Sequence, residues 1–301
     1  MRKVVEKDSR RWDELHPGGS FLNRNERLSA RRVGISRLLC YDIPKRRDTM
    51  TLAEFCEKIA LPDQVVERVL SVPEVPEALL VQLRTPELWP LGRAAVKAYL
   101  KPDNDGFGEL AAQLQCALKT WETYRFSEEI FIETMKCFTR FVCEHLESYG
   151  RYGFDRGFWT VRQLSGVLFR IGELEYEIRE DAIHLHIPSD AVLEPERLRR
   201  SWEAARALLG PGEMVCHSWL LSPDLPGLLE ETSRILAFQR NFHIFDPEPE
   251  DSVRQWVFKN PSLSDEALPE DTSLQRRLKA FLLAGNTFHA AHGRLREEPF
   301  Q

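Results

Sequence analysis

Two segments in the second half of the chain alternate apolar and polar side chains. FRIGELEYEI (169–178) and AIHLHIPS (182–189) repeat with a period of two residues, which is typical of half-buried strands. Gly172, between Ile171 and Glu173, suits a tight hairpin turn. The pattern therefore predicts a hairpin within 169–178 and a further strand over 182–189.

Helical spacing follows this strand. EPERLRRSWEAARALL (194–209) places Pro195 in a first helical turn, where its missing N–H costs nothing. Thr272 and Gln275 match a capping box at the start of a late helix. The predicted order after the first helix is strand 214–221, a helix opened by Ser222-Pro223-Asp224, strands 242–245 and 255–258, and helix 268–285.

Residues 51–150 show helical spacing almost throughout. TLAEFCEKIAL (51–61) has apolar residues at i, i+3, i+4 and i+7, Ser127 suits an N-cap, and Gly150 suits a helix end. We predict a bundle of five or six helices here. In the junction 151–166, we expect Phe158, Trp159 and Leu164 to pack between the bundle and the sheet.

The fold class is therefore α+β, a helical bundle followed by a mixed β-sheet flanked by helices. Residues 1–49 carry 13 Lys and Arg against 7 Asp and Glu, whereas the remainder is acidic. We expect a basic, poorly ordered extension over 1–49, a helical domain over 50–152 and a sheet domain over 153–301. An acidic body argues against a nucleic-acid partner, since phosphate binding needs clustered cations.

Composition places the chain among soluble globular proteins. Of its 301 residues, 43% are hydrophobic and 29% are charged. No apolar run approaches the roughly 20 residues that cross a bilayer, and the charged start does not resemble a secretory signal. The six cysteines form no C-x-x-C pair, as expected of reduced core residues. We expect a cytoplasmic protein with no membrane partner.

Four stretches carry a family resemblance: IHLHIPSDAVLEPERLRRSWEAARALL, VCHSWLLSPDLPGLL, ILAFQRNFHI and LPEDTSLQRRLKAFLLAG. Their most specific parts are HSWLL and LP-x-DT-x-LQ. They resemble a family of bacterial acyltransferase-like proteins that join a helical N-acyltransferase N-terminal domain to a GNAT-like C-terminal domain, and the resemblance covers roughly residues 51–290. It implies a GNAT-type fold, acyl-coenzyme A or acetyl-coenzyme A as co-substrate, and a small-molecule or peptide amine as acceptor; it leaves the oligomeric state open.

GNAT enzymes typically bind the coenzyme pyrophosphate on backbone N–H groups of a glycine-rich loop before a helix. The matching joint here, 188–196, has no glycine and holds three carboxylates, Asp190, Glu194 and Glu196. This departure keeps a second interpretation open, a non-catalytic binding or regulatory module that has lost the coenzyme site. The coenzyme contacts that the resemblance implies are His186, Ser189, Ala191, Trp219 and Leu220.

Acyl transfer to an amine needs a base rather than a protein nucleophile. The first candidate base is His217, because a histidine titrates near neutral pH; Glu175 is the second, since GNAT enzymes often use a strand glutamate. Glu173, Glu175 and Glu177 share one strand face, and a solvated glutamate ladder is the commoner arrangement. Cys216 is expected in the core.

A histidine cluster offers a third interpretation. His184 and His186 lie two apart on a predicted strand, so their side chains share a face. With His217 they would form a three-histidine metal site of a hydrolase. No carboxylate or cysteine with ligand spacing reinforces that cluster, so we expect no metal.

Overall fold

The computed structural model describes residues 49–100, 103–260 and 262–301. The predicted basic extension lies outside these residues, apart from Thr49. Within the described ranges, no helix is both long and apolar enough to cross a membrane.

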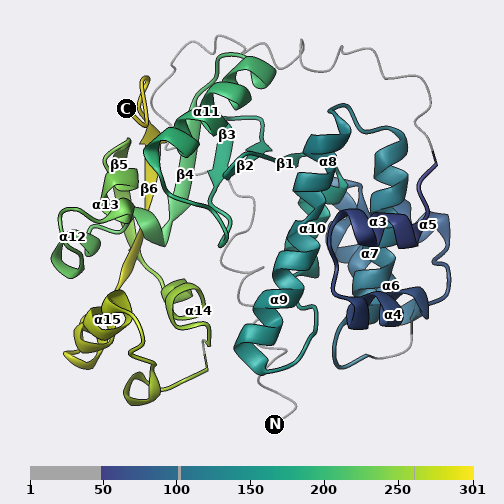
Figure 1. Ribbon diagram of the computed structural model, residues 1–301, viewed down its shortest axis with the longest axis horizontal. Coiled ribbons are helices and arrows are strands. Elements are labelled where there is room, and N and C mark those ends of the chain that lie inside the picture. The colour runs from purple at the N-terminus through teal and green to yellow at the C-terminus, as the bar shows by residue number, and fades with distance from the viewer. Residues whose placement is uncertain (1–48, 101–102, 261) are drawn as a thin grey trace. The chain divides into compact units, whose positions relative to one another are not determined.

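The first part of the described chain is helical, as predicted (Figure 1). Ser127 caps α8, because its side chain accepts a hydrogen bond from the Ile130 N–H. The described residues of 51–150 hold seven α-helices rather than five or six, since the run 128–149 breaks at Lys136. The helices are α3 (Leu52–Lys58), α4 (Asp63–Leu70), α5 (Glu77–Leu83), α6 (Trp89–Tyr99), α7 (Phe107–Glu122), α8 (Glu128–Met135) and α9 (Cys137–Tyr149), with the 3₁₀ turn η1 (Pro86–Leu88) and, after them, α10 (Gly157–Leu164).

The second part holds a six-stranded mixed sheet of order β1-β2-β3-β4-β6-β5 (Figure 1). All neighbouring pairs are antiparallel except β3 and β4, which run parallel. β3 and β4 are joined through helix α11, as a parallel pair requires. The strands are β1 (Leu168–Ile171), β2 (Leu174–Ile178), β3 (Ile183–His186), β4 (Met214–Ser218), β5 (Phe242–Pro249) and β6 (His289–Leu295).

Seven helical segments accompany the sheet. Pro195 occupies the first turn of its helix, and the Thr272–Gln275 capping box is formed in full, as predicted. The segments are α11 (Pro195–Leu209), η2 (Trp219–Leu221), α12 (Leu225–Leu228), α13 (Arg234–Gln239), α14 (Ser252–Phe258), η3 (Asp265–Ala267) and α15 (Ser273–Leu283).

The predicted hairpin of β1 and β2 is confirmed. Ile171 pairs with Leu174, which leaves a two-residue turn at Gly172 and Glu173. Gly172 has φ of +62°, and a Cβ there would collide with the Ser201 side chain of α11. Glycine is therefore required both by the backbone conformation and by the close approach of this helix.

The final strand prediction is wrong. Residues 255–258 belong to helix α14, because Val253 and Val257 share one helical face and pack into an apolar cluster. The last strand is instead β6, which was not among the predicted strands. Gly293 in β6 is needed because a Cβ there would lie 2.6 Å from Cδ1 of Leu221.

Two further element boundaries differ from the prediction. The strand expected over 214–221 ends at Ser218, where the chain turns into η2. The helix expected after Asp224 is divided into α12 and α13. Both breaks follow local side-chain caps: the Ser218 hydroxyl accepts from the Leu220 N–H, and the Ser233 hydroxyl accepts from the Ile235 N–H.

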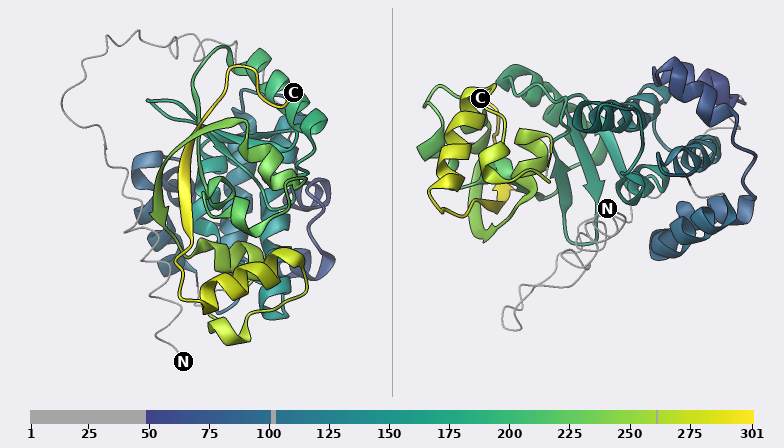
Figure 2. Two further views of the ribbon diagram at one scale, coloured as in Figure 1. Left: turned by 90° about the vertical axis from the view of Figure 1, so that its left-hand side faces the viewer. Right: turned by 90° about the horizontal axis from the view of Figure 1, so that it is seen from below.

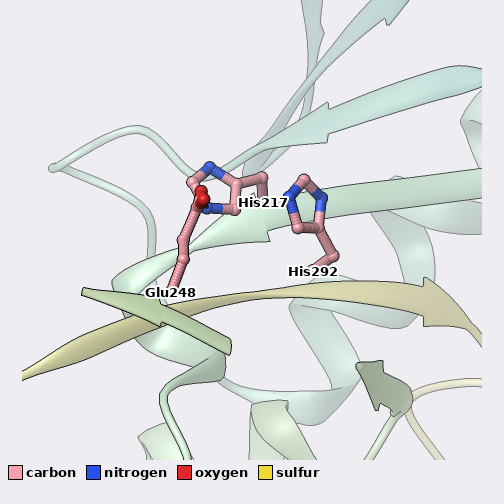
Figure 3. A group of neighbouring side chains, drawn as sticks. All are labelled: His217, Glu248 and His292. Atoms are coloured by element: carbon pink, nitrogen blue, oxygen red, sulfur yellow. Dashed lines mark ion pairs between the residues drawn. The ribbon is translucent and has the colours of Figure 1, made fainter. Parts of the chain in front are cut away.

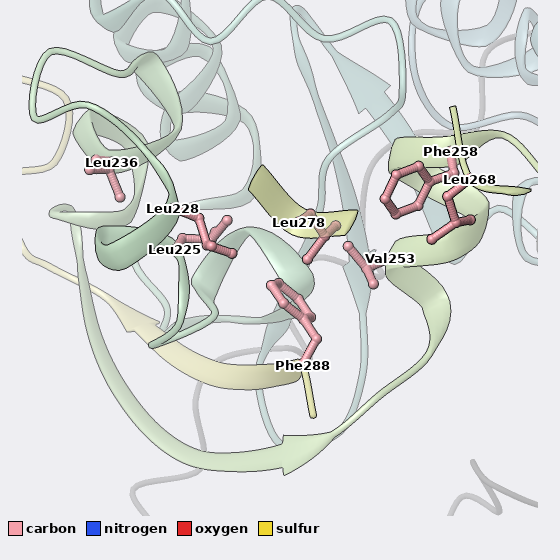
Figure 4. Packing of buried hydrophobic residues seen from close by; sticks show 8 residues of the cluster. All are labelled: Leu225, Leu228, Leu236, Val253, Phe258, Leu268, Leu278 and Phe288. Carbon is pink, nitrogen blue, oxygen red and sulfur yellow. The ribbon is translucent and has the colours of Figure 1, made fainter. Parts of the chain in front are cut away.

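The C-terminal helices share an apolar cluster beside the sheet (Figure 4). Figure 2 shows from two further directions that α15, in yellow, lies beside the yellow-green α14. Trp219 of η2 is half-buried against this cluster, so the end of β4 is anchored by packing. The buried members are Leu225, Leu228, Leu236, Val253, Phe258, Leu268, Leu278 and Phe288.

Helix α8 covers the outer edge of the sheet at β1. The Thr134 hydroxyl accepts a hydrogen bond of 2.9 Å from the Arg170 N–H. A bare strand edge offers unpaired N–H groups to other chains. This hydrogen bond satisfies one such N–H group of β1 within the protein.

Candidate active site

The backbone ladder between the parallel strands β3 and β4 ends early. The two strands pair only at Ile183–Met214 and His184–Val215. Beyond this point β3 stays paired with β2, and β4 stays paired with β6. Within the described sheet, Leu185 and Cys216 therefore do not pair with each other, and the β3–β4 ladder is open beyond His184 and Val215.

The acidic joint before α11 is neutralised by the protein itself. Asp190 receives two hydrogen bonds from Arg170, at 2.9 and 2.8 Å. Glu194 lies 3.3 Å from an Arg234 nitrogen, and Glu196 pairs with Arg199. The three carboxylates are thus engaged by arginines, which reduces the repulsion that their sequence positions predict.

Backbone and hydroxyl groups of the same joint are also engaged. The Ser189 hydroxyl donates to Glu144 of α9, and the Ala191 N–H donates to the Pro188 carbonyl at 2.9 Å. The Val192 N–H donates to the Glu173 carboxylate at 2.7 Å. The two predicted coenzyme contacts in the joint, Ser189 and Ala191, therefore already hold internal hydrogen bonds.

A cavity of about 180 Å³ lies where the first turn of α11 meets the end of α13. Pro195 and Leu198 line one side, and Phe238 and Arg240 line the other. Arg240 also lines a neighbouring pocket of about 410 Å³. The positive end of α11 and the Arg240 guanidinium make this region suitable for an anionic group.

His217 lies on β4, opposite His292 of β6, beside an acidic side chain (Figure 3). Its Nε2 is 3.0 Å from a carboxylate oxygen of Glu248 and 3.9 Å from one of Glu250. The ring of His292 stacks on it, with centroids 4.3 Å apart. The His217 side chain is 23% exposed and Glu248 is 56% exposed, so the group is accessible from solvent.

Glu250 is the more buried of the two carboxylates. Burial raises its pKa, and the nearby Glu248 and Asp251 charges act in the same direction. A raised pKa favours the neutral form of this side chain. Glu250 therefore carries a negative charge less readily than an ordinary exposed carboxylate.

Cys216, next to His217, is not a nucleophile. Its side chain is buried, and burial raises the pKa of its thiol to about 12. The neutral thiol is unreactive. The core position predicted for Cys216 is confirmed.

The predicted solvated glutamate ladder on β2 is wrong. Glu173, Glu175 and Glu177 are all buried, because α9, α10 and α11 bring arginines to them. Glu175 receives a 2.7 Å hydrogen bond from Arg140 of α9, and both side chains are less than a tenth exposed. Glu175 thus belongs to a buried ion pair on β2, and β3 lies between this strand and β4.

Glu177 forms the second part of this buried network. Its carboxylate lies 2.9 Å from Nε2 of His186 and 2.8 Å from a nitrogen of Arg179. Burial by itself would raise the pKa of Glu177, but the hydrogen bonds and charges of His186 and Arg179 hold it well below its usual range. His186 also contacts Trp159 edge to face.

The three histidines considered as a metal site are not brought together. His184 faces Asp181 at 3.4 Å, His186 faces Glu177, and His217 faces Glu248.

Of the other predicted coenzyme contacts, Trp219 and Leu220 lie in η2, directly after β4. Leu220 is buried, and its carbonyl accepts from Gln239.

Sequence reasoning missed Glu248, His292 and Arg240. Glu248 lies between the predicted strands 242–245 and 255–258, and His292 follows the last predicted element. One signal was present: FHAAHGRL (288–295) mixes small and polar residues without a helical stripe, which is compatible with a strand beside a crowded neighbour.

An α+β fold with one splayed parallel strand pair and this strand order defines a GNAT-like protein. Residues 120–295 match the family described as GNAT-like C-terminal domain, and residues 50–166 match the N-acyltransferase N-terminal domain. The chain belongs to the GNAT-like C-terminal domain family. The predicted family and the predicted fold class are confirmed.

Solved acyltransferase structures share the fold. One, in complex with decanoyl-CoA and teicoplanin, is 22% identical, with 87% of this chain and 93% of that chain covered and a TM-score of 0.67. Another, with CoA and 10C-teicoplanin, is 22% identical over 88% and 94%, with a TM-score of 0.68. A third, with decanoyl-CoA, is 23% identical over 87% and 93%, with a TM-score of 0.65. No match was found among curated proteins.

Proposed function

We propose that this protein is an N-acyltransferase that moves an acyl group from acyl-coenzyme A to an amine. The observation that carries the proposal is the early end of the β3–β4 ladder. Unpaired strand backbone can hydrogen-bond an extended, amide-containing chain as a further strand would, and the pantetheine arm of coenzyme A is such a chain. The family match and the acyl-CoA complexes of the structural neighbours support the same donor.

We propose that the nucleotide end of the coenzyme binds at the cavity beside α11. Pro195 in the first turn of α11 and Arg240 both line the cavity, and a helix N-terminus and an arginine both attract phosphate. In this proposal the anion is bound by Arg240 and the helix end instead of by a glycine-rich loop. The ion pairs of Asp190, Glu194 and Glu196 with arginines weaken the sequence argument for a module that has lost the coenzyme.

His217 is the proposed base. The neutral acceptor amine attacks the thioester carbonyl carbon, the C–N bond forms, and the C–S bond then breaks. The imidazole of His217 takes the proton that the nitrogen loses, and the coenzyme A thiolate leaves and is protonated. Glu248, 3.0 Å from Nε2 of His217, stabilises the imidazolium that results.

Glu175 is the weaker candidate for this role. Its carboxylate is bound by Arg140 and is 3% exposed in its side chain, so an acceptor amine has no direct approach to it. We therefore assign Glu175 to anchoring α9 on the sheet. Of the predicted coenzyme contacts, we retain Trp219 and Leu220, which follow the unpaired end of β4.

The acceptor class remains a small molecule or peptide with a primary amine. Teicoplanin is the first acceptor to try, because it occurs with a structural neighbour. A cytoplasmic location and the division into domains 50–152 and 153–301 also stay predictions.

The test combines binding with turnover. Calorimetry with acetyl-, octanoyl- and decanoyl-coenzyme A should give saturable binding of at least one thioester. Incubation with teicoplanin and a panel of primary amines should release free coenzyme A and add one acyl mass to an amine. Binding without turnover over the whole panel would exclude the amines tried as acceptors. No binding of any thioester would exclude the acyltransferase and favour the module that has lost the coenzyme site.

A further inference from the structure

Three adjacent strands bring two imidazoles and a carboxylate to one face of the sheet (Figure 3). His217 on β4 is directly opposite His292 on β6, and directly paired residues of neighbouring strands point to the same face. Glu248 comes from β5, on the far side of β6. Their ligand atoms all lie within 4.8 Å of one another.

A bulge in β5 is what turns Glu248 toward the histidines. Phe245 pairs with His292, but Glu248 pairs with Ala290, so β5 has one residue more than β6 in this interval. Without the extra residue, alternation would place Glu248 on the opposite face. Asp246, inside the bulge, has φ of +46°, which is unfavourable for a residue with a side chain. This backbone conformation belongs to the bulge that turns the Glu248 carboxylate toward the two histidines.

We infer that His217, Glu248 and His292 form a binding site for a divalent transition-metal ion, and that a bound ion suppresses acyl transfer. Two histidines and one glutamate are a known ligand set for zinc, with one coordination position left open. Imidazole nitrogen selects zinc, cobalt or nickel over magnesium and calcium, which prefer oxygen ligands only. The chemical class is therefore a borderline-soft dication.

The present distances allow such a site after small side-chain movements. Ligand atoms around tetrahedral zinc lie about 3.4 Å apart, given bonds of about 2.1 Å. The His217 Nε2 to Glu248 distance is already 3.0 Å. The rings of His217 and His292 are stacked at 30° and must turn slightly for both nitrogens to meet one ion. Glu248 is more than half exposed, so it is able to follow.

Suppression follows from the chemistry of a coordinated imidazole. A metal ion takes the lone pair of one ring nitrogen, and the other nitrogen then carries the hydrogen. Such a ring cannot accept the proton of the acceptor amine. This second half of the inference rests on the proposed function, whereas metal binding itself does not.

Binding is tested on the full chain without any substrate. Cobalt(II) added to metal-free protein should produce the visible absorption of a low-coordinate site, and zinc should abolish it at one equivalent. His292→Phe keeps an aromatic ring between His217 and Phe245 but removes a ligand, so zinc affinity by calorimetry should fall at least tenfold. His184→Gln is the matched control, since His184 faces Asp181 outside the cluster. Equal zinc affinity in wild type and His292→Phe would overturn the site.

Suppression is tested by the ratio of transfer rates with and without stoichiometric zinc. In wild type, stoichiometric zinc should lower the transfer rate at least tenfold. In His292→Phe, the rates with and without zinc should be nearly equal. Wild-type protein that binds zinc at this site and transfers acyl groups undiminished would refute the suppression. If no condition gives transfer, the proposed function fails while the cobalt spectrum still decides the metal site.

Discussion

Two regions of one sheet combine carboxylates with cationic or imidazole side chains. They differ in how far these side chains are exposed to solvent. On β2, Glu175 and Arg140 are paired and both less than a tenth exposed. On β4 and β5, His217 and Glu248 are also in contact, but they are 23% and 56% exposed. The first group is covered by helices that bring arginines to it, whereas the second meets solvent.

This difference separates a structural role from a chemical one. A buried ion pair loses its solvation and has to stay paired, because an uncompensated charge in the interior is costly. An exposed histidine–carboxylate pair keeps access to water and to substrates, and its contribution to stability is small. Residue type alone would have assigned both groups the same role.

The largest effect is expected from His217→Gln. Loss of a general base typically costs about 10²–10⁴ in rate, so transfer should fall by that range while thioester affinity and the melting temperature stay near wild type. Steady-state kinetics, calorimetry and a thermal melt measure the three quantities. His184→Gln should keep the wild-type rate, and an equal rate loss in both variants would argue against a role specific to His217.

Arg140→Met should have the largest effect on stability. It leaves Glu175 buried without its partner, which costs about 3–5 kcal/mol of unfolding free energy, measured by urea denaturation. Adding Glu175→Gln should recover part of the loss, because the stranded charge is removed. Additive losses in the double variant would show that the two side chains do not stabilise each other.

Glu177→Gln should destabilise in a pH-dependent way. Because the folded pKa of Glu177 is depressed by His186 and Arg179, its contribution is complete above the unfolded pKa of about 4.3 and is lost as pH falls toward the folded pKa. The difference in melting temperature between wild type and variant should be full at pH 7 and should shrink below about pH 4. A difference that is constant from pH 7 to pH 3 would contradict this assignment.

Arg240→Ala should have the smallest effect, confined to the coenzyme. Loss of one phosphate contact should raise the dissociation constant for coenzyme A about tenfold, or about 1.4 kcal/mol, as measured by calorimetry. An acyl-pantetheine, which lacks the nucleotide, should bind wild type and variant equally. A wild-type affinity for coenzyme A in the variant would remove Arg240 from the proposed site.

Local signals account for much of the second half of the chain. The period of two residues located β2 and β3, Pro195 located the start of α11, and Thr272 with Gln275 located the start of α15. These signals depend on neighbours within a few residues, so no tertiary contact is needed to interpret them. The strand predicted over 255–258 was wrong for the same reason. Four residues are too few to distinguish the two-residue period of a strand from the 3.6-residue period of a helix.

The sequence by itself determined the α+β class, the order of elements from the hairpin to β4, and the position of His217 on a strand. Only the tertiary structure decided that β6 lies between β4 and β5, which places His292 and Glu248 beside His217. It also decided that helices cover the glutamates of β2. The physical reason is that strand order, register and burial are set by packing between segments far apart in the chain, whereas periodicity and caps act only within a few residues.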